Sequence, residues 1–255
     1  MGIIKDKGRW ERSSLSNSKV KSLRNKHPLN FQTYSMAAHH LISCEVAKKL
    51  SSIRKKQIVY KGYDINYLYN LVLLPTIDQV SCQYNVPLHK SGHTDRRLEE
   101  YFQRDSGKNL EGELSELEGG LKQETDADKS KLLAGDLSMV ASVRGYHKVV
   151  GSMLAKTLKN LDCDTEAQEY VDSLDELSID IADLLGCHKL HLISRGRHLT
   201  PLGKGCHMCR SGKVDTPRLH YLSGSRDFDE PVPSQAKVKK FCFEGASLKT
   251  MGELV

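Results

Sequence analysis

The chain has 255 residues with a formal net charge of +6, and 38% of its residues are hydrophobic. This length predicts one or two domains and is enough to bury a core, which excludes a chain that is disordered throughout. No run approaches the ~18 apolar residues that a membrane-spanning helix needs, so we also exclude a transmembrane protein.

Charge divides the chain into unlike parts. Residues 1–60 carry 13 Lys or Arg against 3 Asp or Glu, residues 99–186 carry 9 against 20, and residues 187–255 carry 12 against 6. Basic ends around an acidic middle predict a surface that faces a polyanion and a segment that is kept away from it. Together with the motifs below, this pattern predicts four parts: a basic, partly flexible arm (1–33), a core (34–104), an acidic linker with a helical hairpin (105–186) and a basic, Cys/His-rich region (187–255).

Within the core, residues 46–58 are predicted to form a helix, because Val46, Leu50 and Ile53 recur at helical spacing. Residues 70–75 are a short apolar run that ends at a proline, which favours a buried strand. Residues 87–101 are predicted to follow as a helix that starts near a proline.

The acidic middle contains two predicted helices. Residues 105–130 hold four glycines and eight acidic side chains, so we expect an exposed, weakly ordered linker. Residues 131–161 are predicted as a long amphipathic helix with a kink at Gly145, and residues 165–185 as a second helix that packs with the first as a hairpin. An acidic face that docks a basic partner is the alternative interpretation of this hairpin. After Cys187 the scarcity of apolar runs predicts loops and short strands.

Four histidines stand out in the core: the adjacent pair His39 and His40, followed by His89 and His93. His89 and His93 are four residues apart, so on a helix they share one face and can hold one divalent ion between them. Side chains alternate along a strand, so His39 and His40 do not both face that ion. One of the pair is therefore expected to bind metal and the other to act as a base, which Asn70 at the start of the next strand can orient.

Hydrolysis of a phosphodiester needs this combination of groups. A cation neutralises charge that builds on the phosphate and the leaving oxygen, and an imidazole with a pKa near neutrality can deprotonate water. Lys90, Arg96 and Arg97 accompany the histidines and are predicted to hold a nucleic-acid backbone, with a solvated basic face as the alternative. We expect His27 and His147 to be ordinary polar residues.

Four segments occur in a characteristic order: Tyr34–Ile42 with its Ala38-His39-His40, Gly62–Asn66, Asn70–Pro75 and Leu88–His93. This ordered set resembles the AHH nucleases of the HNH/endonuclease VII superfamily, over about residues 34–101. The resemblance implies an α+β protein with a small ββα-metal nuclease core. The rest of the chain is then a mostly helical extension and a loop-rich C-terminal region.

The same resemblance implies the role of each histidine. His39, His89 and His93 would bind one divalent ion (Mg²⁺, Mn²⁺, Ni²⁺ or Zn²⁺) and His40 would be the general base, while Asn70 would orient His40 or the loop at the metal site. DNA is the implied substrate, ahead of RNA. Paired cysteines around the second strand are absent, so the site would depend on packing rather than on a structural zinc there.

The C-terminal region contains a separate candidate zinc site, formed by Cys187, His191, Cys206 and Cys209. The spacing C-x3-H, fourteen intervening residues and C-x2-C resembles that of zinc knuckles. Ordinary reduced cysteines in a loop are the alternative, because an odd total of seven cysteines favours reduced thiols in a cytosolic type of protein.

We therefore expect a metal-dependent endonuclease. AHH nucleases are frequent as toxin domains of bacterial contact-dependent or type VI secretion effectors, which implies a cognate immunity protein and a secretion-apparatus partner. The resemblance also implies a protein that is cytoplasmic in its producer and is delivered to a target cell without a signal peptide. This agrees with Met1–Lys5, which begins no apolar signal stretch. Two alternatives stay open: a non-catalytic, zinc-containing nucleic-acid-binding protein, and a phage or housekeeping HNH endonuclease.

Overall fold

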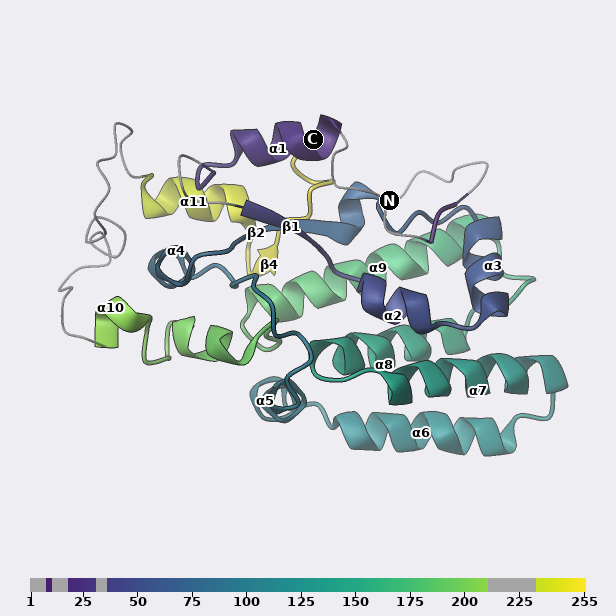
Figure 1. Cartoon of the computed structure of the whole chain (residues 1–255). Coiled ribbons are helices and arrows are strands. Elements are labelled where there is room, and N and C mark those ends of the chain that lie inside the picture. The colour runs from purple at the N-terminus through teal and green to yellow at the C-terminus, as the bar shows by residue number, and fades with distance from the viewer. Residues whose placement is uncertain (1–7, 11–17, 31–35, 211–232) are drawn as a thin grey trace.

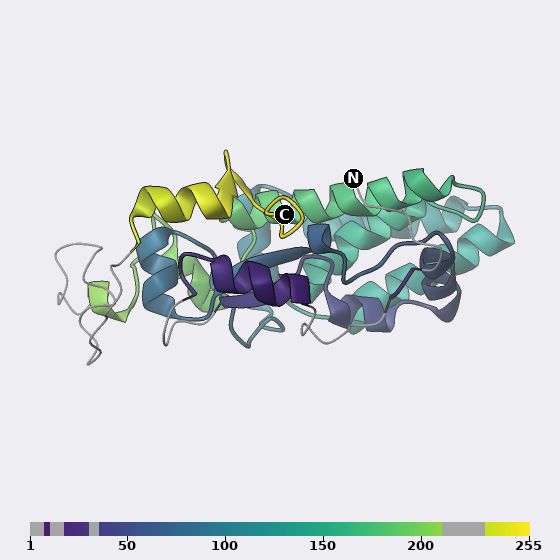
Figure 2. The ribbon, with the colours of Figure 1, turned by 90° about the horizontal axis from the view of Figure 1, so that it is seen from above.

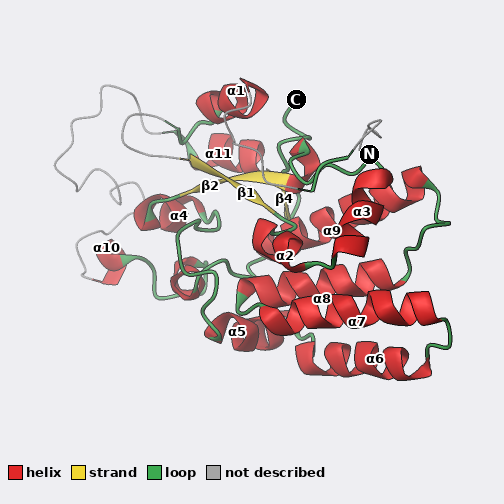
Figure 3. Cartoon of the chain, turned by 45° about the vertical axis from the view of Figure 1, so that its right-hand side comes forward, coloured by secondary structure: helices red, strands yellow, loops and turns green. Residues whose placement is uncertain are grey.

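A computed structural model describes residues 8–10, 18–30, 36–210 and 233–255 (Figure 1). Helices dominate the described chain, and its strands form two short antiparallel pairs (Figure 3). The elements are, in order, α1 (Ser18–Lys26), β1 (Met36–His40), α2 (Cys44–Lys49), α3 (Ser52–Tyr60), η1 (Leu68–Asn70), β2 (Leu71–Pro75), α4 (Asp78–Tyr84), α5 (Arg97–Ser106), α6 (Leu110–Gln123), α7 (Ala127–Ser142), α8 (Tyr146–Lys159), α9 (Ala167–Gly186), η2 (Ser194–Leu199), α10 (His207–Arg210), α11 (Gln235–Cys242), β3 (Phe243–Glu244) and β4 (Ser247–Leu248). The predicted α+β class with a mostly helical extension is confirmed.

The strands β1 and β2 lie in the middle of the molecule, between α1 and α11 on one side and α8 and α9 on the other (Figure 1). They pair antiparallel, with His39 opposite Val72 and His40 opposite Leu71. Every residue of β2 is buried, as a continuous apolar run predicts. The run ends at Pro75, which has no N–H with which to extend the ladder. The pair therefore holds the two adjacent histidines at the edge of a packed core.

The helix predicted over 131–161 is in fact two helices, α7 and α8, which are separated at residues 143–145. Gly145 has φ +61°, and a Cβ there would lie 2.5 Å from the carbonyl oxygen of His93, so a side chain does not fit. Tyr146, the first residue of α8, donates its backbone N–H to the same carbonyl over 2.8 Å. The break thus sets the start of α8 against the segment that carries His93.

Helix α6 occupies much of the segment predicted as a weakly ordered linker, so that prediction is wrong. Leu110 and Leu117 are buried, and Leu114 and Leu121 pack against the same core at helical spacing. The side chain of Asn109 caps the first turn by accepting the N–H of Gly112 over 3.0 Å. The acidic residues of this segment cover the solvent side of an amphipathic helix.

The helix predicted over 46–58 is also broken, into α2 and α3. Ser51 has extended backbone, and its hydroxyl caps α3 by accepting the N–H of Arg54 over 3.2 Å. The guanidinium of Arg54 turns inward and donates to Asp136 and to the carbonyls of Leu158 and Leu161. This buried contact fastens α3 to α7 and to the end of α8.

Part of the predicted basic arm is folded. Helix α1 buries Val20 and Leu23, and the indole N–H of Trp10 donates to the carbonyl of Ala47 over 3.0 Å. The rest of the arm (1–7, 11–17 and 31–33), Tyr34 and Ser35 of the motif, and residues 211–232 lie outside the described residues.

The described part of the C-terminal region contains the expected short strands and also the helical segments η2, α10 and α11, which were not expected. Thr250 bridges to Val72, so the end of the chain extends the central pair of strands. Seen from above, α6 to α9 extend to one end of an elongated molecule, and α11 lies in the other half (Figure 2). None of the described helices is both long and apolar enough to span a bilayer.

Candidate active site

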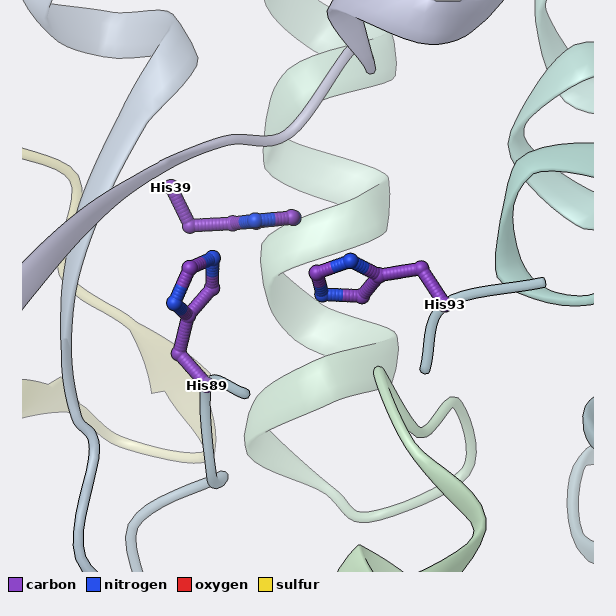
Figure 4. Close-up of side chains that lie close together, drawn as sticks. All are labelled: His39, His89 and His93. Atoms are coloured by element: carbon purple, nitrogen blue, oxygen red, sulfur yellow. The ribbon is translucent and has the colours of Figure 1, made fainter. Parts of the chain in front are cut away.

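Three of the four singled-out histidines converge, as Figure 4 shows. The ring centroids are 5.0 Å apart for His39 and His89, 5.6 Å for His39 and His93, and 5.3 Å for His89 and His93. One ring nitrogen from each lies within 4.8 Å of the other two. His39 comes from β1, and the other two come from the segment between α4 and α5.

That segment is not the predicted helix over 87–101. Residues 85–96 form turns and irregular chain, and α5 begins only at Arg97. Asn85 ends α4 with φ 53°, Pro87 disfavours a helix at the residue before it, and Gly92 has φ 116°. The histidines still meet because two backbone hydrogen bonds hold their segment. The N–H of His89 donates to the carbonyl of Pro75 over 2.9 Å, and the carbonyl of His93 accepts the N–H of Tyr146 at the start of α8.

Tyr146 fixes the ring of His39. Its hydroxyl donates to the carbonyl of Leu41 over 3.0 Å and lies 3.0 Å from Nε2 of His39. A hydroxyl has one proton, so its oxygen must accept the Nε2–H of His39. In this tautomer Nδ1 of His39 carries the lone pair, and a hydrogen-bond acceptor for the other ring nitrogen is the usual support for a metal-binding imidazole.

His40 has a different partner, as expected for the alternate position of the strand. Its Nε2 lies 3.3 Å from Oδ1 of Asn66, and Nδ2 of Asn66 donates to Oδ1 of Asp64 over 3.0 Å. The carboxylate only accepts, so it fixes the orientation of the amide and leaves Oδ1 facing His40. An amide oxygen cannot donate, so Nε2 of His40 carries the proton and Nδ1 carries the lone pair.

Asn70 does not reach the His40 ring. It is fully buried; its Oδ1 accepts the N–H of Ile42 over 2.7 Å and the hydroxyl of Ser178 over 3.1 Å, and its Nδ2 donates to the carbonyl of Ile65 over 2.7 Å. Of the two roles expected for Asn70, this geometry fits the one that holds the loop after the histidine strand. The contact with the His40 ring belongs to Asn66.

The three converging imidazoles suit a divalent cation. Burial lowers the pKa of His39 well below its usual value, and His89 and His93 add to this effect. Burial also lowers the pKa of His93 to about 4, and its Nε2 is buried without a hydrogen-bond partner in the described structure. Neutral imidazoles with an unsatisfied nitrogen are the form that coordinates Zn²⁺, Ni²⁺ or Mn²⁺.

His147 also belongs to this neighbourhood and was not singled out. Its ring lies 5.6 Å from that of His93, and its Nδ1 lies 2.7 Å from the Ser43 hydroxyl. His147 and Tyr146 open α8, far along the chain from the motif. The one signal that pointed to them is Gly145, which was predicted to interrupt a helix.

The predicted nucleic-acid-binding residues lie on the surface beside the histidine segment. The ammonium of Lys90 pairs with Asp78 at 2.9 Å and the guanidinium of Arg97 with Asp95 at 2.6 Å. Arg96 is exposed at the start of α5. These contacts leave all three side chains at the surface, and their part in binding stays a prediction.

The predicted zinc set is not brought together as a whole. Cys206 and Cys209 group with Cys82 of α4, and their sulfur atoms lie within 4.8 Å of one another. Cys187 is exposed at the end of α9, where its thiol meets the carbonyl of Ala246, and the ring of His191 lies 3.3 Å from a carboxylate oxygen of Asp105. Sequence spacing missed Cys82, because it is more than a hundred residues from its partners.

The match to a known protein family is consistent with a nuclease site at these histidines. No curated protein and no solved structure gives a significant match to the chain. Residues 21–134 match the family model of AHH, a nuclease family of the HNH/ENDO VII superfamily with conserved AHH. The match includes His39, His40, His89 and His93 and ends before α8. Residues 21–134 therefore carry the match to the AHH nucleases, a family of phosphodiester hydrolases.

Proposed function

We propose that the chain is a metal-dependent endonuclease whose cation is held by His39, His89 and His93 and whose general base is His40. The observation that carries the proposal is the division of the adjacent pair: His39 faces the other two imidazoles, whereas His40 faces Asn66. Because the two side chains lie on opposite sides of β1, His39 is proposed as a metal ligand and His40 as the base.

The residues of the chain prepare a water molecule for attack on phosphorus. Asp64 orients the Asn66 amide, which accepts the Nε2–H of His40 and leaves Nδ1 as the proton acceptor. Tyr146 holds the ring of His39 against Leu41. When bound, the divalent ion supplies positive charge that stabilises the phosphate and the leaving oxygen. His40 takes the proton from water, and no covalent intermediate with the protein forms.

We propose DNA as the substrate. The nuclease family implies a nucleic acid, and Lys90, Arg96 and Arg97 supply surface cations beside the histidine segment. Such contacts give affinity for the phosphate backbone that is largely blind to sequence and sensitive to salt. RNA cleavage at an equal or higher rate than DNA cleavage would contradict this part of the proposal.

A plasmid-nicking assay tests the activity. The purified full-length chain is expected to nick supercoiled DNA when Mg²⁺, Mn²⁺, Ni²⁺ or Zn²⁺ is supplied and to stop when a chelator is added. Binding of DNA without cleavage in all four metals would contradict the proposal and would favour a non-catalytic binding protein.

We further propose that the enzyme acts as an antibacterial toxin that a secretion system delivers, with a cognate immunity protein. The support is the likeness of its motifs to the AHH nucleases that occur as effector domains. Expression of the chain in a bacterium that lacks the proposed immunity protein is expected to be toxic, and expression of the His40→Ala variant is not. Growth without impairment by the active chain would favour a phage or housekeeping endonuclease.

A further inference from the structure

Three cysteines meet in a group that is separate from the three histidines. Cys82 lies on α4, whereas Cys206 and Cys209 flank the start of α10. Their sulfur atoms lie within 4.8 Å of one another, and Sγ of Cys82 is 3.8 Å from Sγ of Cys209. We propose that these thiols bind one Zn²⁺ ion, which is separate from the ion of the active site.

The sulfur separation matches that of ligands on one metal. Thiolates at ~2.3 Å around a tetrahedral zinc are about 3.8 Å apart. A disulfide needs its sulfur atoms at about 2.05 Å, so the 3.8 Å between Cys82 and Cys209 is not a disulfide. The described cysteines are all unbridged.

The backbone around Cys206 is shaped to bring the thiols together. Gly205 has φ +74°, and a Cβ there would lie 2.6 Å from Cβ of Cys209. The backbone N–H of Cys206 donates to Sγ of Cys82 over 3.4 Å. An N–H that points at a cysteine sulfur stabilises negative charge on it, which is the charge that a zinc ligand carries.

A soft, doubly charged ion suits three converging thiols, because binding releases the thiol protons to solvent and leaves three thiolates on the metal. Among the described residues no further His, Cys, Asp or Glu joins the group, so the three thiols are assigned as the ligands.

The site would tie two distant parts of the chain. Helix α4 leads from β2 into the segment that carries His89 and His93. The segment around Cys206 follows η2, whose Arg195 donates to Asp78 of α4 over 2.7 Å. The ion and this pair would therefore hold the C-terminal region against the helix that leads into the active-site segment.

Cobalt(II) tests the assignment without any use of nuclease activity. The full-length chain, reduced and stripped of metal, is titrated with Co²⁺, and the thiolate-to-cobalt charge-transfer absorption is recorded. We expect the wild type to show this absorption with an intensity that corresponds to three thiolates. Zinc is expected to displace the cobalt and to protect three thiols from a thiol-reactive dye.

Variants identify the ligands. Cys82→Ser and Cys209→Ser are expected to lose most of the charge-transfer absorption and one equivalent of bound zinc. Cys163→Ser and Cys187→Ser remove exposed thiols outside the group and are expected to match the wild type. His39→Ala is expected to keep the thiolate absorption, which separates this site from the active site.

Three results would overturn the proposal: no thiolate absorption in the wild type, the same absorption in Cys82→Ser and Cys209→Ser as in the wild type, or a Cys82–Cys209 disulfide in the chain as isolated. Circular dichroism of each variant shows whether it is folded. Should Cys82→Ser unfold, the wild-type cobalt spectrum and the more accessible Cys209→Ser variant decide the question.

Discussion

His40 and Asn66 illustrate how a single contact can define a chemical role. The amide of Asn66 is oriented by Asp64, and it determines which nitrogen of His40 carries the proton. The same logic applies to His39, whose tautomer is determined by a tyrosine from a distant helix. The tautomer of each imidazole is therefore determined by a neighbouring side chain of the protein.

Replacement of Asn66 by Ala is expected to slow cleavage by about 10- to 100-fold, because the His40 ring loses the partner that fixes its tautomer. Metal affinity is expected to stay unchanged, since the contact that Asn66 makes is with His40, which is not one of the three proposed ligands. Single-turnover nicking and a metal titration measure the two effects. Asn160→Ala, an exposed change at the far end of α8, serves as the control. Equal rates for both variants would contradict the role of Asn66.

The Tyr146→Phe variant removes the hydroxyl that contacts Nε2 of His39. We expect metal affinity to fall about 10-fold, because Nε2 of His39 loses its acceptor, and the free energy of unfolding to fall by about 1 kcal/mol through the lost bond to Leu41. Isothermal titration with Mn²⁺ or Zn²⁺ and denaturant unfolding measure these quantities. An unchanged metal affinity in a stably folded variant would show that Tyr146 does not support His39.

Helices and strands position these residues through a few buried polar contacts. Asn70 holds the loop after β1, and Arg54 fastens α3 to α7 and α8. Arg54 and Asp136 are almost completely buried, with 2.9 Å between the guanidinium and the carboxylate. Removal of one partner from such a pair leaves an uncompensated charge in the core.

Asp136→Ala is expected to lower the free energy of unfolding by about 3–5 kcal/mol at pH 8, where Asp136 is ionised. The double variant Arg54→Met, Asp136→Leu is expected to be more stable than Asp136→Ala, because no charge remains buried. Urea unfolding measures both. A double variant no more stable than the single variant would contradict this account.

The same carboxyl group predicts a dependence on pH. Burial raises the pKa of Asp136 to about 6 despite the opposing effect of Arg54, and its Oδ1 has no hydrogen-bond partner. The folded state therefore binds the proton more tightly than the unfolded state, so the stability from this group is present below pH 4 and lost as the pH rises through 6. Relative to Asp136→Asn, the wild type is expected to lose stability between pH 4 and 6. A constant difference over that interval would contradict the raised pKa.

Some elements could be predicted from the sequence and others could not. The apolar run that ends at Pro75 identified β2, and the ordered histidines identified the metal-binding candidates. The helix predicted over 87–101 was wrong. The spacing of four between His89 and His93 suits a helix, but Pro87 and Gly92, which has φ 116°, favour the irregular chain that is found there. Helix α6 was missed because glycines and acidic residues outweighed its leucine spacing, although that spacing was visible. Asn66 lies inside a recognised motif, whereas Cys82 and Tyr146 depend on tertiary contacts that no local pattern records.

At the scale of the whole molecule, the site extends beyond the segment that matches the family. Residues 21–134 supply the four histidines, but α8 supplies Tyr146 and α9 supplies Ser178, which donates to Asn70. The backbone carbonyls of Leu158, in α8, and of Leu161, just after it, also accept hydrogen bonds from the guanidinium of Arg54. The helices α8 and α9, which follow the matched segment, therefore contribute hydrogen bonds to the histidine site and to Asn70.

A chain truncated after residue 134 is expected to lose cooperative thermal unfolding and nuclease activity, because the core of β1 and β2 loses α8 and α9. Circular dichroism on heating and plasmid nicking measure these losses. Cooperative unfolding together with activity in the truncated chain would show that residues 1–134 suffice.

The central claim is that the adjacent histidines have separate tasks, and bound metal measured together with nicking tests it most directly. His40→Ala is expected to keep the active-site metal and to lose nicking by about 10²- to 10⁴-fold, whereas His39→Ala is expected to lose both. His198→Ala, in η2 outside the cluster, is expected to match the wild type. Cleavage at the wild-type rate by His40→Ala, or full active-site metal in His39→Ala, would contradict the account.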